Sequence, residues 1–518
     1  MTAWMNLGQQ LKMNAAKYPD TVALKDATRS FTYPETNRRV NQLAHSLLAL
    51  GLKKGDKIAV FMENSIEIIE AYLATAKTGI VIVPINFRLV GKEVEYIVNN
   101  SDAKAFMVDS EFAAMIDGIR PQLKNIPPDR YIGVGSACDG YREYESFIGG
   151  AATEEPDIPV DSKDTWILIY TSGTTGKPKG VVRSHESHIA FYLINGIDFG
   201  FNEHDICMNV MPLCHINSTY FTFTFTYIGA SVYVHPARSF KPEEILKIIE
   251  KEKITFISLI PTHYNLILNV SEHARRHDVG SIRKLLCSSA PVRKDMKLAI
   301  MDFFRGVELY EGYGSTEAGI VTVLKPEDQL RKLGSIGKES LGTDRIKLLN
   351  ENGNEVSVGE VGELYSRGPM LFDEYYKLPE KTRSSFQGEW FSAGDMARQD
   401  EDGFYQIVDR KDNMIITGGE NVYPSEVEEV VGAHECVFDC AVIGLPDDKW
   451  GEKVVAVVIP KAQKKDEISE EMIIACCKDQ MAGYKRPKKI VFISEEEMPR
   501  TPTGKILHRK LRDKLGEK

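Results

Sequence analysis

The segment from Tyr170 to Gly180 has the residue types that bind a polyphosphate. Its glycines let the backbone turn tightly and bring N–H groups close to an anion, while its hydroxyls and lysines add donors and positive charge. These residues are Thr171, Ser172, Gly173, Thr174, Thr175, Gly176, Lys177, Lys179 and Gly180. A predicted strand, Thr165 to Tyr170, comes directly before them. The segment therefore predicts a loop that holds a triphosphate.

The spacing of this loop differs from that of a Walker loop. A Walker loop has four residues between its first glycine and its Gly-Lys pair. Only Thr174 and Thr175 separate Gly173 from Gly176 here. A P-loop kinase or NTPase is therefore disfavoured.

Three further segments suit the rest of a nucleotide. Glu317 follows Thr316, and a carboxylate beside a hydroxyl can hold Mg²⁺ through oxygen. The small residues Ser288 to Pro291 let a flat ring stack against the backbone, and Asp395 can accept both hydroxyls of a ribose. Taken alone, the first segment fits an ordinary turn equally well, and the second fits a loop.

Two segments near the C-terminus have special backbones. Pro499 to Lys505 contains two prolines and a glycine, which present Lys505 on a rigid turn. A fixed ammonium can stabilise the negative charge that develops on phosphorus and on a departing pyrophosphate. In the segment Met414 to Pro424, the adjacent glycines Gly418 and Gly419 leave room for a thin ligand.

Together these segments resemble the motifs of the adenylate-forming superfamily: acyl-CoA synthetases, peptide-synthetase adenylation domains and beetle luciferases. The motifs occur in the family's order from Phe31 to Leu511, so the resemblance covers nearly the whole chain. It implies an enzyme that uses ATP and Mg²⁺ to activate a carboxylic acid as its acyl-adenylate and then transfers the acyl group to coenzyme A. Such catalysis consists of positioning and electrostatic stabilisation, so no side-chain nucleophile is needed.

The resemblance also implies roles for single residues. Around the nucleotide and metal these residues are Thr316 on the α-phosphate, Glu317 on Mg²⁺, Tyr313 in the same motif, Ser289, Ala290 and Pro291 along the adenine, and Asp395 with Arg410 at the ribose. Lys505 matches the adenylation lysine, and Gly418 and Gly419 match the segment that lines the pantetheine tunnel. The hinge position falls on Asp412, about which a small domain is expected to rotate between the two half-reactions.

Six residues match positions that border the acyl group in the family. They are His215, Asn217, Ser218, Gly312, Ile320 and Val321. His215 is expected near the acyl carboxylate, with a core histidine as the alternative. Gly312 leaves space, and apart from Glu317 no carboxylate is expected to face the pocket. The resemblance therefore predicts a hydrophobic monocarboxylic acid, whether aromatic, alicyclic or medium-chain, and the polar Asn217 and Ser218 favour a compact or ring-bearing one.

Other activities share these motifs. An enzyme that loads the phosphopantetheine of a carrier protein in trans is the main alternative, and a luciferase-like activity is another. A non-catalytic nucleotide-binding protein is disfavoured because Lys505, Glu317 and Asp395 are all in place.

Composition narrows the class of protein further. The 518 residues are 43% hydrophobic and 27% charged, which suggests two or three packed units around a sizeable core. The net charge of −10 argues against a nucleic-acid partner. The eight cysteines do not have the spacing of a zinc site, which favours reduced thiols and a cytoplasmic location. The expected partners are a carboxylic acid, ATP and coenzyme A. A homodimer is left open.

One uncharged segment needs separate attention. Ile206 to Ala237 contains no Asp, Glu, Lys or Arg. Its polar residues and its β-branched and aromatic content predict buried strand and loop rather than a transmembrane segment.

Strand and helix patterns alternate along most of the chain. Strands are predicted at Lys57 to Phe61, Ile80 to Pro84 and Lys253 to Ile260, and helices at Ser65 to Lys77 and Pro242 to Lys251. Such alternation indicates parallel α/β layers. A β-rich subdomain is predicted around Ile346 to Leu364, which contains an Asn-Gly turn.

The last hundred residues show a different pattern. Two strands, Asp439 to Gly444 and Val454 to Ile459, precede a helix from Ser469 to Gln480. We therefore expect an α/β fold with a large N-terminal domain that binds ATP and the acyl group, residues 1–411, and a small mobile α+β domain, residues 412–518.

Overall fold

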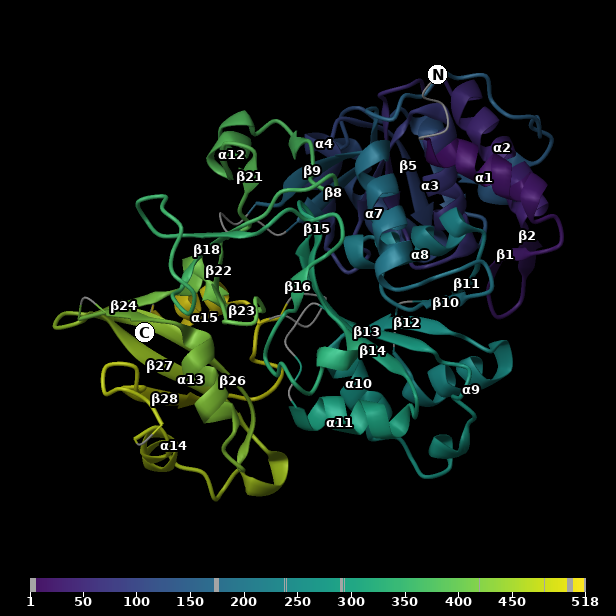
Figure 1. Cartoon of the computed structure of the whole chain (residues 1–518). Helices are drawn as coiled ribbons and strands as arrows, with labels where there is room; N and C mark the ends of the chain where they lie inside the picture. The colour runs from purple at the N-terminus through teal and green to yellow at the C-terminus, as the bar shows by residue number, and fades with distance from the viewer. Residues whose placement is uncertain are drawn as a thin grey trace. The chain divides into compact units, whose positions relative to one another are not determined.

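The computed structural model describes residues 6–171, 177–236, 238, 240–288, 292, 294–418, 420–478, 480–500 and 506–516. The chain divides into two compact units (Figure 1). The N-terminal unit comprises Met1–Arg345 and Ser366–Phe391, and the C-terminal unit comprises Ile346–Tyr365 and Ser392–Lys518. Both contain helices packed on sheets, which confirms the predicted α/β class. The expected pivot at Asp412 concerns movement and stays a prediction.

The first sheet of the N-terminal unit has eight strands and contains three of the predicted ones. Their order is β19 (Glu374–Tyr375), β9 (Lys179–Ser184), β8 (Thr165–Thr171), β4 (Val81–Ile85), β3 (Lys57–Phe61), β5 (Ala103–Asp109), β6 (Tyr131–Val134) and β7 (Arg142–Glu143). β3 pairs in parallel with β4 and β5, whereas β8 and β9 form an antiparallel hairpin.

The second sheet of this unit has nine strands. Their order is β16 (Lys338–Glu339), β15 (Gly319–Leu324), β14 (Glu308–Ser315), β13 (Lys284–Ser288), β12 (Phe256–Leu259), β10 (Ile206–Asn209), β11 (Ser231–Val234), β1 (Val22–Lys25) and β2 (Ser30–Thr32). A separate short hairpin is formed by β20 (Phe386–Gln387) and β21 (Trp390–Phe391).

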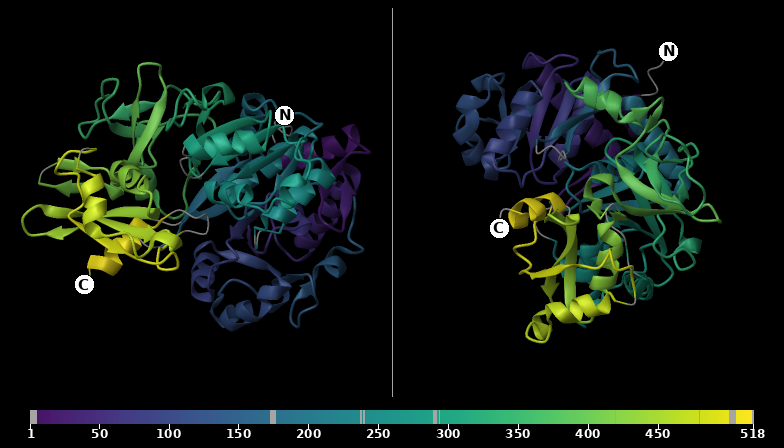
Figure 2. Two further views of the ribbon diagram at one scale, coloured as in Figure 1. Left: turned by 90° about the horizontal axis from the view of Figure 1, so that it is seen from below. Right: turned by 90° about the vertical axis from the view of Figure 1, so that its left-hand side faces the viewer.

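Helices cover both faces of the eight-stranded sheet (Figure 2). On β3, Ile58 and Val60 face a core shared with α3, whereas Ala59 and Phe61 face a second core shared with α4. The helices of the N-terminal unit are α1 (Leu7–Lys17), α2 (Tyr33–Ala49), α3 (Ile66–Thr78), α4 (Gly91–Asn100), α5 (Ala113–Ile119), α6 (Tyr144–Ile148), α7 (His185–Asp198), α8 (Ile216–Ile228), α9 (Pro242–Glu252), α10 (Pro261–Leu268), α11 (Lys294–Phe303) and α12 (Pro379–Ser384).

Helix α3 illustrates how local signals set an element. The Ser65 side chain accepts a hydrogen bond from the Ile68 amide, and the helix ends at Gly79 with φ of 67°. The serine satisfies an amide that the start of a helix leaves open, and the left-handed conformation of the glycine ends the helix. Every residue of α3 is buried, so the helix lies inside the unit between other elements.

The prediction for Ile206 to Ala237 is partly wrong. β10 and β11 are buried strands as expected, but α8 between them is a helix. Its phenylalanines and threonines favour strand by propensity, yet α8 packs against α7 and is buried along its whole central part, so tertiary burial overrides local preference. None of the helices in the described part of the chain has both the length and the hydropathy that crossing a bilayer requires.

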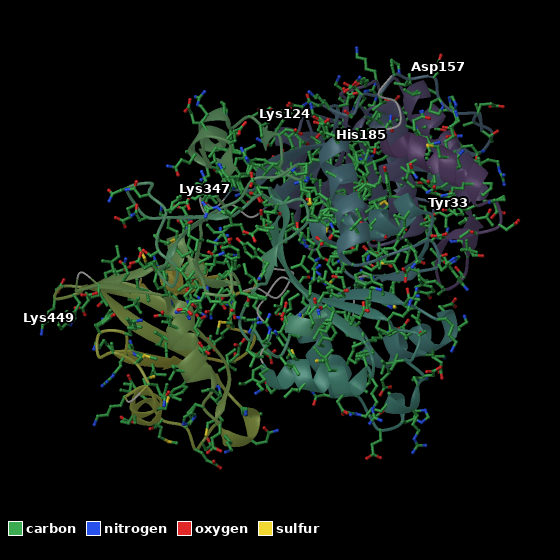
Figure 3. All side chains as sticks on the ribbon, in the orientation of Figure 1. Tyr33, Lys124, Asp157, His185, Lys347 and Lys449 are labelled. Atoms are coloured by element: carbon green, nitrogen blue, oxygen red, sulfur yellow. The ribbon has the colours of Figure 1, made fainter. Side chains whose placement is uncertain are left out.

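Acid is expected to destabilise the N-terminal unit through His185, which is labelled in Figure 3. This histidine is fully buried, and its ring stacks on that of Trp166. Burial lowers the pKa of His185 to about 4. The unfolded chain, with an ordinary pKa near 6.5, therefore binds the proton first, and stability is lost as the pH falls from 6.5 towards 4.

For His185 alone, we expect the unfolding free energy to fall by about 2 kcal/mol between pH 7.5 and pH 5. Urea titrations at both values measure this change. His185→Phe, which keeps a ring against Trp166, should show a weaker pH dependence than the wild type, while His204→Asn at an exposed position should not. If the unfolding free energy of His185→Phe changed with pH as much as that of the wild type, the expectation would be contradicted.

The C-terminal unit contains the remaining two sheets. One has the order β17 (Lys347–Leu349), β18 (Gly362–Tyr365), β22 (Asp395–Gln399) and β23 (Tyr405–Arg410), and the other has the order β25 (Glu420–Val422), β24 (Ile415–Thr417), β27 (Gly451–Pro460) and β26 (Val437–Asp447), with β28 (Lys489–Phe492) beside β27. The helices are α13 (Pro424–Gly432), α14 (Glu470–Cys476) and α15 (His508–Gly516). Ser469 caps α14 as predicted, but the helix ends at Cys476 rather than at Gln480.

Candidate active site

The predicted phosphate loop connects the two strands of a β-hairpin. β8 ends at Thr171 and β9 begins at Lys179, and these two residues pair directly. Ser172, Gly173, Thr174, Thr175 and Gly176 lie outside the described residues. The hydroxyl of Thr171 is buried, and no described residue bonds to it. A buried hydroxyl of this kind calls for a partner, which a loop residue or a bound phosphate can supply.

The two lysines of the loop point to different places. Lys179 Nζ lies 3.9 Å from Glu317 Oε1, so the structure brings the loop together with the predicted metal carboxylate. Lys177 Nζ lies 5.8 Å from the centre of the Tyr96 ring instead. Lys179 is therefore the loop cation that the fold places beside Glu317.

Glu317 is held by a residue that the sequence did not single out. The hydroxyl of Tyr375 donates to Glu317 Oε1 at 2.7 Å, and Lys179 Nζ lies 4.2 Å above the Tyr375 ring. Tyr375 is buried on β19, next to the phosphate hairpin. Its hydrogen bond fixes one carboxylate oxygen and leaves Oε2 without a bond from any described residue.

The main chain of the Thr316–Glu317 segment is clamped by Arg183 of β9. Arg183 is fully buried and donates to the carbonyls of Thr316 at 2.7 Å and Met370 at 2.6 Å. The Glu317 carbonyl also accepts from the Phe372 amide at 2.7 Å. Sequence reasoning missed Arg183, although an arginine directly after the apolar pair Val181 and Val182 was the signal that could have revealed it.

Two predicted nucleotide segments lie on neighbouring strands. β13 and β14 pair in parallel, and their register places Ser288 opposite Gly312. Tyr313 follows Gly312 on β14, while Ser289, Ala290 and Pro291 lie outside the described residues. Gly314 has no room for a side chain, because an added Cβ would lie 1.9 Å from the Gly319 carbonyl oxygen. Gly314 is therefore required by the β14–β15 hairpin itself.

His215 directly precedes helix α8, and its environment keeps it neutral. Burial lowers the pKa of His215 to about 4, with a smaller effect from the nearby Arg88. Its Nε2 atom is buried and has no hydrogen-bond partner in the described part of the chain. An uncharged imidazole with a free nitrogen can bind a polar group of a ligand.

The polar residues of the predicted acyl pocket are bonded within the protein. The Asn217 amide donates to Ser288 Oγ at 2.9 Å and accepts from Ser258 Oγ at 3.0 Å. Ser218 Oγ donates to the Met211 carbonyl at 2.5 Å. Ile320 and Val321 of β15 are buried, as predicted for apolar positions. The polar atoms of Asn217 and Ser218 therefore already have partners within the protein, and the place of these residues in the acyl pocket stays a prediction.

In the C-terminal unit, the two predicted ribose residues are paired. Asp395 on β22 lies opposite Arg410 on β23, and Arg410 Nη1 donates to Asp395 Oδ1 at 3.0 Å. Asp412 lies two residues beyond, in a single helical turn, Lys411–Asn413. The Lys411 amide donates to the Gly394 carbonyl at 2.8 Å, which ties the start of this turn to the residue before Asp395.

Gly418 adopts a conformation that favours glycine. Its φ is +61°, and an added Cβ would lie 3.0 Å from the indole ring of Trp450. The Gly418 amide donates to the Trp450 carbonyl at 2.8 Å. Gly419 and Lys505 lie outside the described residues, so their predicted roles rest on the sequence.

Comparison with known proteins identifies the family. The profile described as "AMP-binding enzyme" matches residues 11–376, and the one described as "AMP-binding enzyme C-terminal domain" matches residues 426–505. A long-chain-fatty-acid–CoA ligase of Mycobacterium tuberculosis is 35% identical over 518 residues, with 98% of each chain covered. A feruloyl-CoA synthase of an Amycolatopsis species is 34% identical over 514 residues, covering 98% of this chain and 99% of the relative.

Solved structures agree with this assignment. The crystal structure of an anthranilate CoA ligase in complex with anthranoyl-AMP superposes with a TM-score of 0.88 at 30% identity, covering 98% of this chain and 97% of that one. The match includes both compact units, because it spans nearly the whole chain. The chain therefore belongs to the AMP-binding enzyme family of the adenylate-forming superfamily, and it is an AMP-forming acid–CoA ligase that uses ATP, Mg²⁺ and coenzyme A.

Proposed function

We propose that the acid activated by this ligase is a hydrophobic monocarboxylic acid, whether aromatic, alicyclic or medium-chain. The apolar surroundings of Gly312 carry this proposal. A Cβ added at Gly312 would lie 3.5 Å from a methyl group of Leu286 and 3.7 Å from that of Ile320. Such a position accepts apolar atoms at ordinary contact distance and offers them no hydrogen bond.

The charges near Gly312 also favour an acid without an ammonium group. Glu311, the residue before Gly312, forms an ion pair with the fully buried Lys297. Its charge is therefore balanced within the protein. Apart from Glu317, which is assigned to Mg²⁺, we expect no carboxylate at this pocket. The ammonium group of an amino acid substrate would then be buried without an anionic partner, which is costly.

A panel of acids tests the proposal. Benzoate, cyclohexanecarboxylate, octanoate, an α-amino acid and a dicarboxylate are compared by AMP release in the presence of ATP, Mg²⁺ and free coenzyme A. We expect the highest kcat/KM with one of the first three. A preference for the amino acid or the dicarboxylate would contradict the proposed substrate class. Acyl-CoA formed from free coenzyme A distinguishes this ligase from an enzyme that loads a carrier protein.

We propose the following roles in the first half-reaction. The loop Thr171–Lys179 holds the triphosphate, and Asp395 with Arg410 holds the ribose. The substrate carboxylate attacks the α-phosphorus and pyrophosphate leaves, while Lys505 stabilises the charge that develops on the departing oxygen. His215, neutral at physiological pH, faces the acyl carboxylate.

In the second half-reaction the same site accepts a thiol. We propose that the C-terminal part rotates about Asp412 and that the pantetheine arm passes beside Gly418 and Gly419. The thiol gives up its proton to solvent and its sulfur attacks the carbonyl carbon of the acyl-adenylate. The C–O bond to the phosphate then breaks, the thioester forms and AMP leaves. The positive φ of Gly418 and its contact with Trp450 define the backbone next to which the arm would pass.

Glu317 fits a magnesium ligand. Its Oε1 is fixed by Tyr375, and its Oε2 receives no bond from the described residues. No cluster of three or more His, Cys, Asp or Glu suited to a metal occurs in the described part of the chain. Mg²⁺ is usually held by one or two carboxylates together with substrate phosphates, and Glu317 supplies one such carboxylate. When bound, the ion supplies positive charge to the phosphate oxygens.

Tyr375→Phe tests whether Tyr375 positions Glu317. The variant loses only the hydroxyl that fixes Oε1, so we expect a roughly 10-fold higher half-saturating Mg²⁺ concentration with little loss of stability. Pyrophosphate exchange into ATP at varied Mg²⁺ concentrations measures this half-saturating concentration. Tyr376→Phe is the matched control, because the Tyr376 hydroxyl bonds to Asp102 instead. Equal shifts in the two variants would argue against a positioning role.

Location and assembly complete the proposal. We propose a cytoplasmic location, supported by eight cysteines that are all free. A homodimer remains a proposal as well, and light scattering on the purified full chain tests it.

A further inference from the structure

A cavity of about 250 Å³ lies in the N-terminal unit, apart from the candidate active-site residues. Its floor consists of Val81 on β4, Leu168 on β8 and Val182 on β9, all on the sheet face that α4 also contacts. The strand register extends this floor to Lys57 on β3 at one end and to Glu374 on β19 at the other. The result is an apolar strip with a charged side chain at each end.

Lys57 differs from the lysines around it. Each of the neighbouring lysines forms an ion pair with an aspartate. These ion pairs are Lys54 with Asp164 at 2.6 Å, Lys104 with Asp56 at 2.6 Å and Lys377 with Asp102 at 2.8 Å. Among the residues that the structure describes, no carboxylate lies within 4.0 Å of Lys57 Nζ. Lys57 is nevertheless half-buried, with its Nζ 5.2 Å from the centre of the Tyr376 ring.

The lack of a close carboxylate affects the pKa of Lys57. Partial burial lowers the pKa of Lys57, and the neighbouring Asp102 only partly offsets this effect. A half-buried ammonium without a close anion gains free energy when an anion binds beside it. The cavity therefore offers an unused charge next to an apolar surface.

The chemistry of the walls narrows the class of ligand. The apolar floor and the Tyr376 ring favour an apolar body. Lys54 and Asp164 also line the cavity and balance each other as an ion pair, whereas the carboxylate of Glu374 at the other end of the floor disfavours a second negative charge and therefore a dianion such as inorganic phosphate. One unpaired ammonium balances one negative charge.

We propose that this cavity is a second ligand site that binds a small organic monocarboxylate, with the carboxylate at Lys57 and the apolar body against Tyr376 and the floor. This site is separate from the one that activates the acid, and the proposal does not depend on which acid is activated. The ligand can be the enzyme's own substrate or another free acid, since both carry the same group.

Trace acetylation of the intact enzyme tests the proposal without turnover. Acetic anhydride is added in the absence of ATP, and the acetylation rate at each lysine is read by mass spectrometry. Benzoate and hexanoate, at up to 50 mM, are compared with benzamide and hexanamide, which lack the charge. We expect the carboxylates to slow acetylation at Lys57 at least 3-fold and saturably, and the amides to leave it unchanged. Lys104 on β5 is the internal control.

The outcomes separate the possibilities clearly. Protection only by an acid that the enzyme turns over identifies the substrate as the ligand, and protection by acids that it does not turn over identifies a broader site. No protection by either carboxylate, or equal protection by the amides, would overturn the proposal. Whether the proposed substrate class is wrong is determined separately, by the turnover of the panel of acids described above.

Variants locate the binding. The catalytic site is first filled with an acyl-sulfamoyl-adenosine made from an acid that the enzyme activates. Equilibrium dialysis with radiolabelled benzoate should then show one remaining site per chain in the wild type and in Lys104→Met, and at least 10-fold weaker binding in Lys57→Met. Tyr376→Leu, which removes the ring but keeps the lysine, should also weaken binding if Lys57→Met is unstable. Wild-type binding in both variants would refute the assignment.

Discussion

Replacing Lys505 by alanine should lower pyrophosphate exchange into ATP by a factor on the order of 10³ while leaving thioester formation from a supplied acyl-adenylate nearly intact. The lysine is proposed to stabilise charge only while pyrophosphate departs, and removal of one such preorganised group costs about 10²–10³ in rate. The thiol step has no departing pyrophosphate, so it does not depend on that charge.

Two assays on the same preparation separate the half-reactions. Pyrophosphate exchange reports adenylation, and acyl-CoA formed from synthetic acyl-adenylate reports thioester formation. Lys510→Ala is the control, because Lys510 is an exposed lysine of α15 close to Lys505 in sequence. A parallel loss of both activities in Lys505→Ala would mean that the lysine supports the whole site rather than one step.

Glu317→Gln should be the most damaging change among the described residues of the site. The substitution keeps the shape of the side chain and an oxygen that can accept from Tyr375, but it removes the negative charge that suits Mg²⁺. We expect adenylation to fall by about 10²–10³-fold. The Mg²⁺ concentration needed for half-maximal exchange should also rise.

Exchange rates at varied Mg²⁺ and a thermal unfolding curve measure these effects. Glu374→Gln is the matched control, since Glu374 lies on β19 beside Tyr375 and is exposed. Unaltered Mg²⁺ dependence in Glu317→Gln would remove the metal role from this residue. A large loss of thermal stability would instead show that the carboxylate mainly supports packing around Lys179 and Tyr375.

Local signals in the sequence were sufficient for elements whose ends and periodicity agree. β3 has its predicted bounds, and α3 begins after the predicted serine and ends at a left-handed glycine. Helix α8 was missed because its burial removes the amphipathic pattern by which a helix is normally recognised. The predicted strand before the phosphate loop is confirmed as β8, whereas β9 after the loop was not predicted. The phosphate-binding role of the loop stays a prediction.

Long-range contacts could not be predicted in the same way. Arg183 contacts Thr316 and Met370, and Tyr375 contacts Glu317, across large separations in sequence. Such contacts depend on how β9, β19 and the end of β14 are arranged, which a single sequence does not specify. The internal hydrogen bonds of Asn217 and Ser218 were not predicted either, and their place in the acyl pocket stays a prediction.

Strand β19 has a pharmacological consequence. Successive side chains on a strand point to opposite sides, so Tyr375 reaches Glu317 while the next residue, Tyr376, borders the cavity at Lys57. The Tyr376 amide also donates to the Gly180 carbonyl at 2.8 Å, directly behind the hairpin that leads into the phosphate loop. A drug-like acid bound in the cavity at Lys57 would contact the strand that follows the nucleotide loop without entering the nucleotide site. We therefore expect it to change the maximal velocity without competing with ATP.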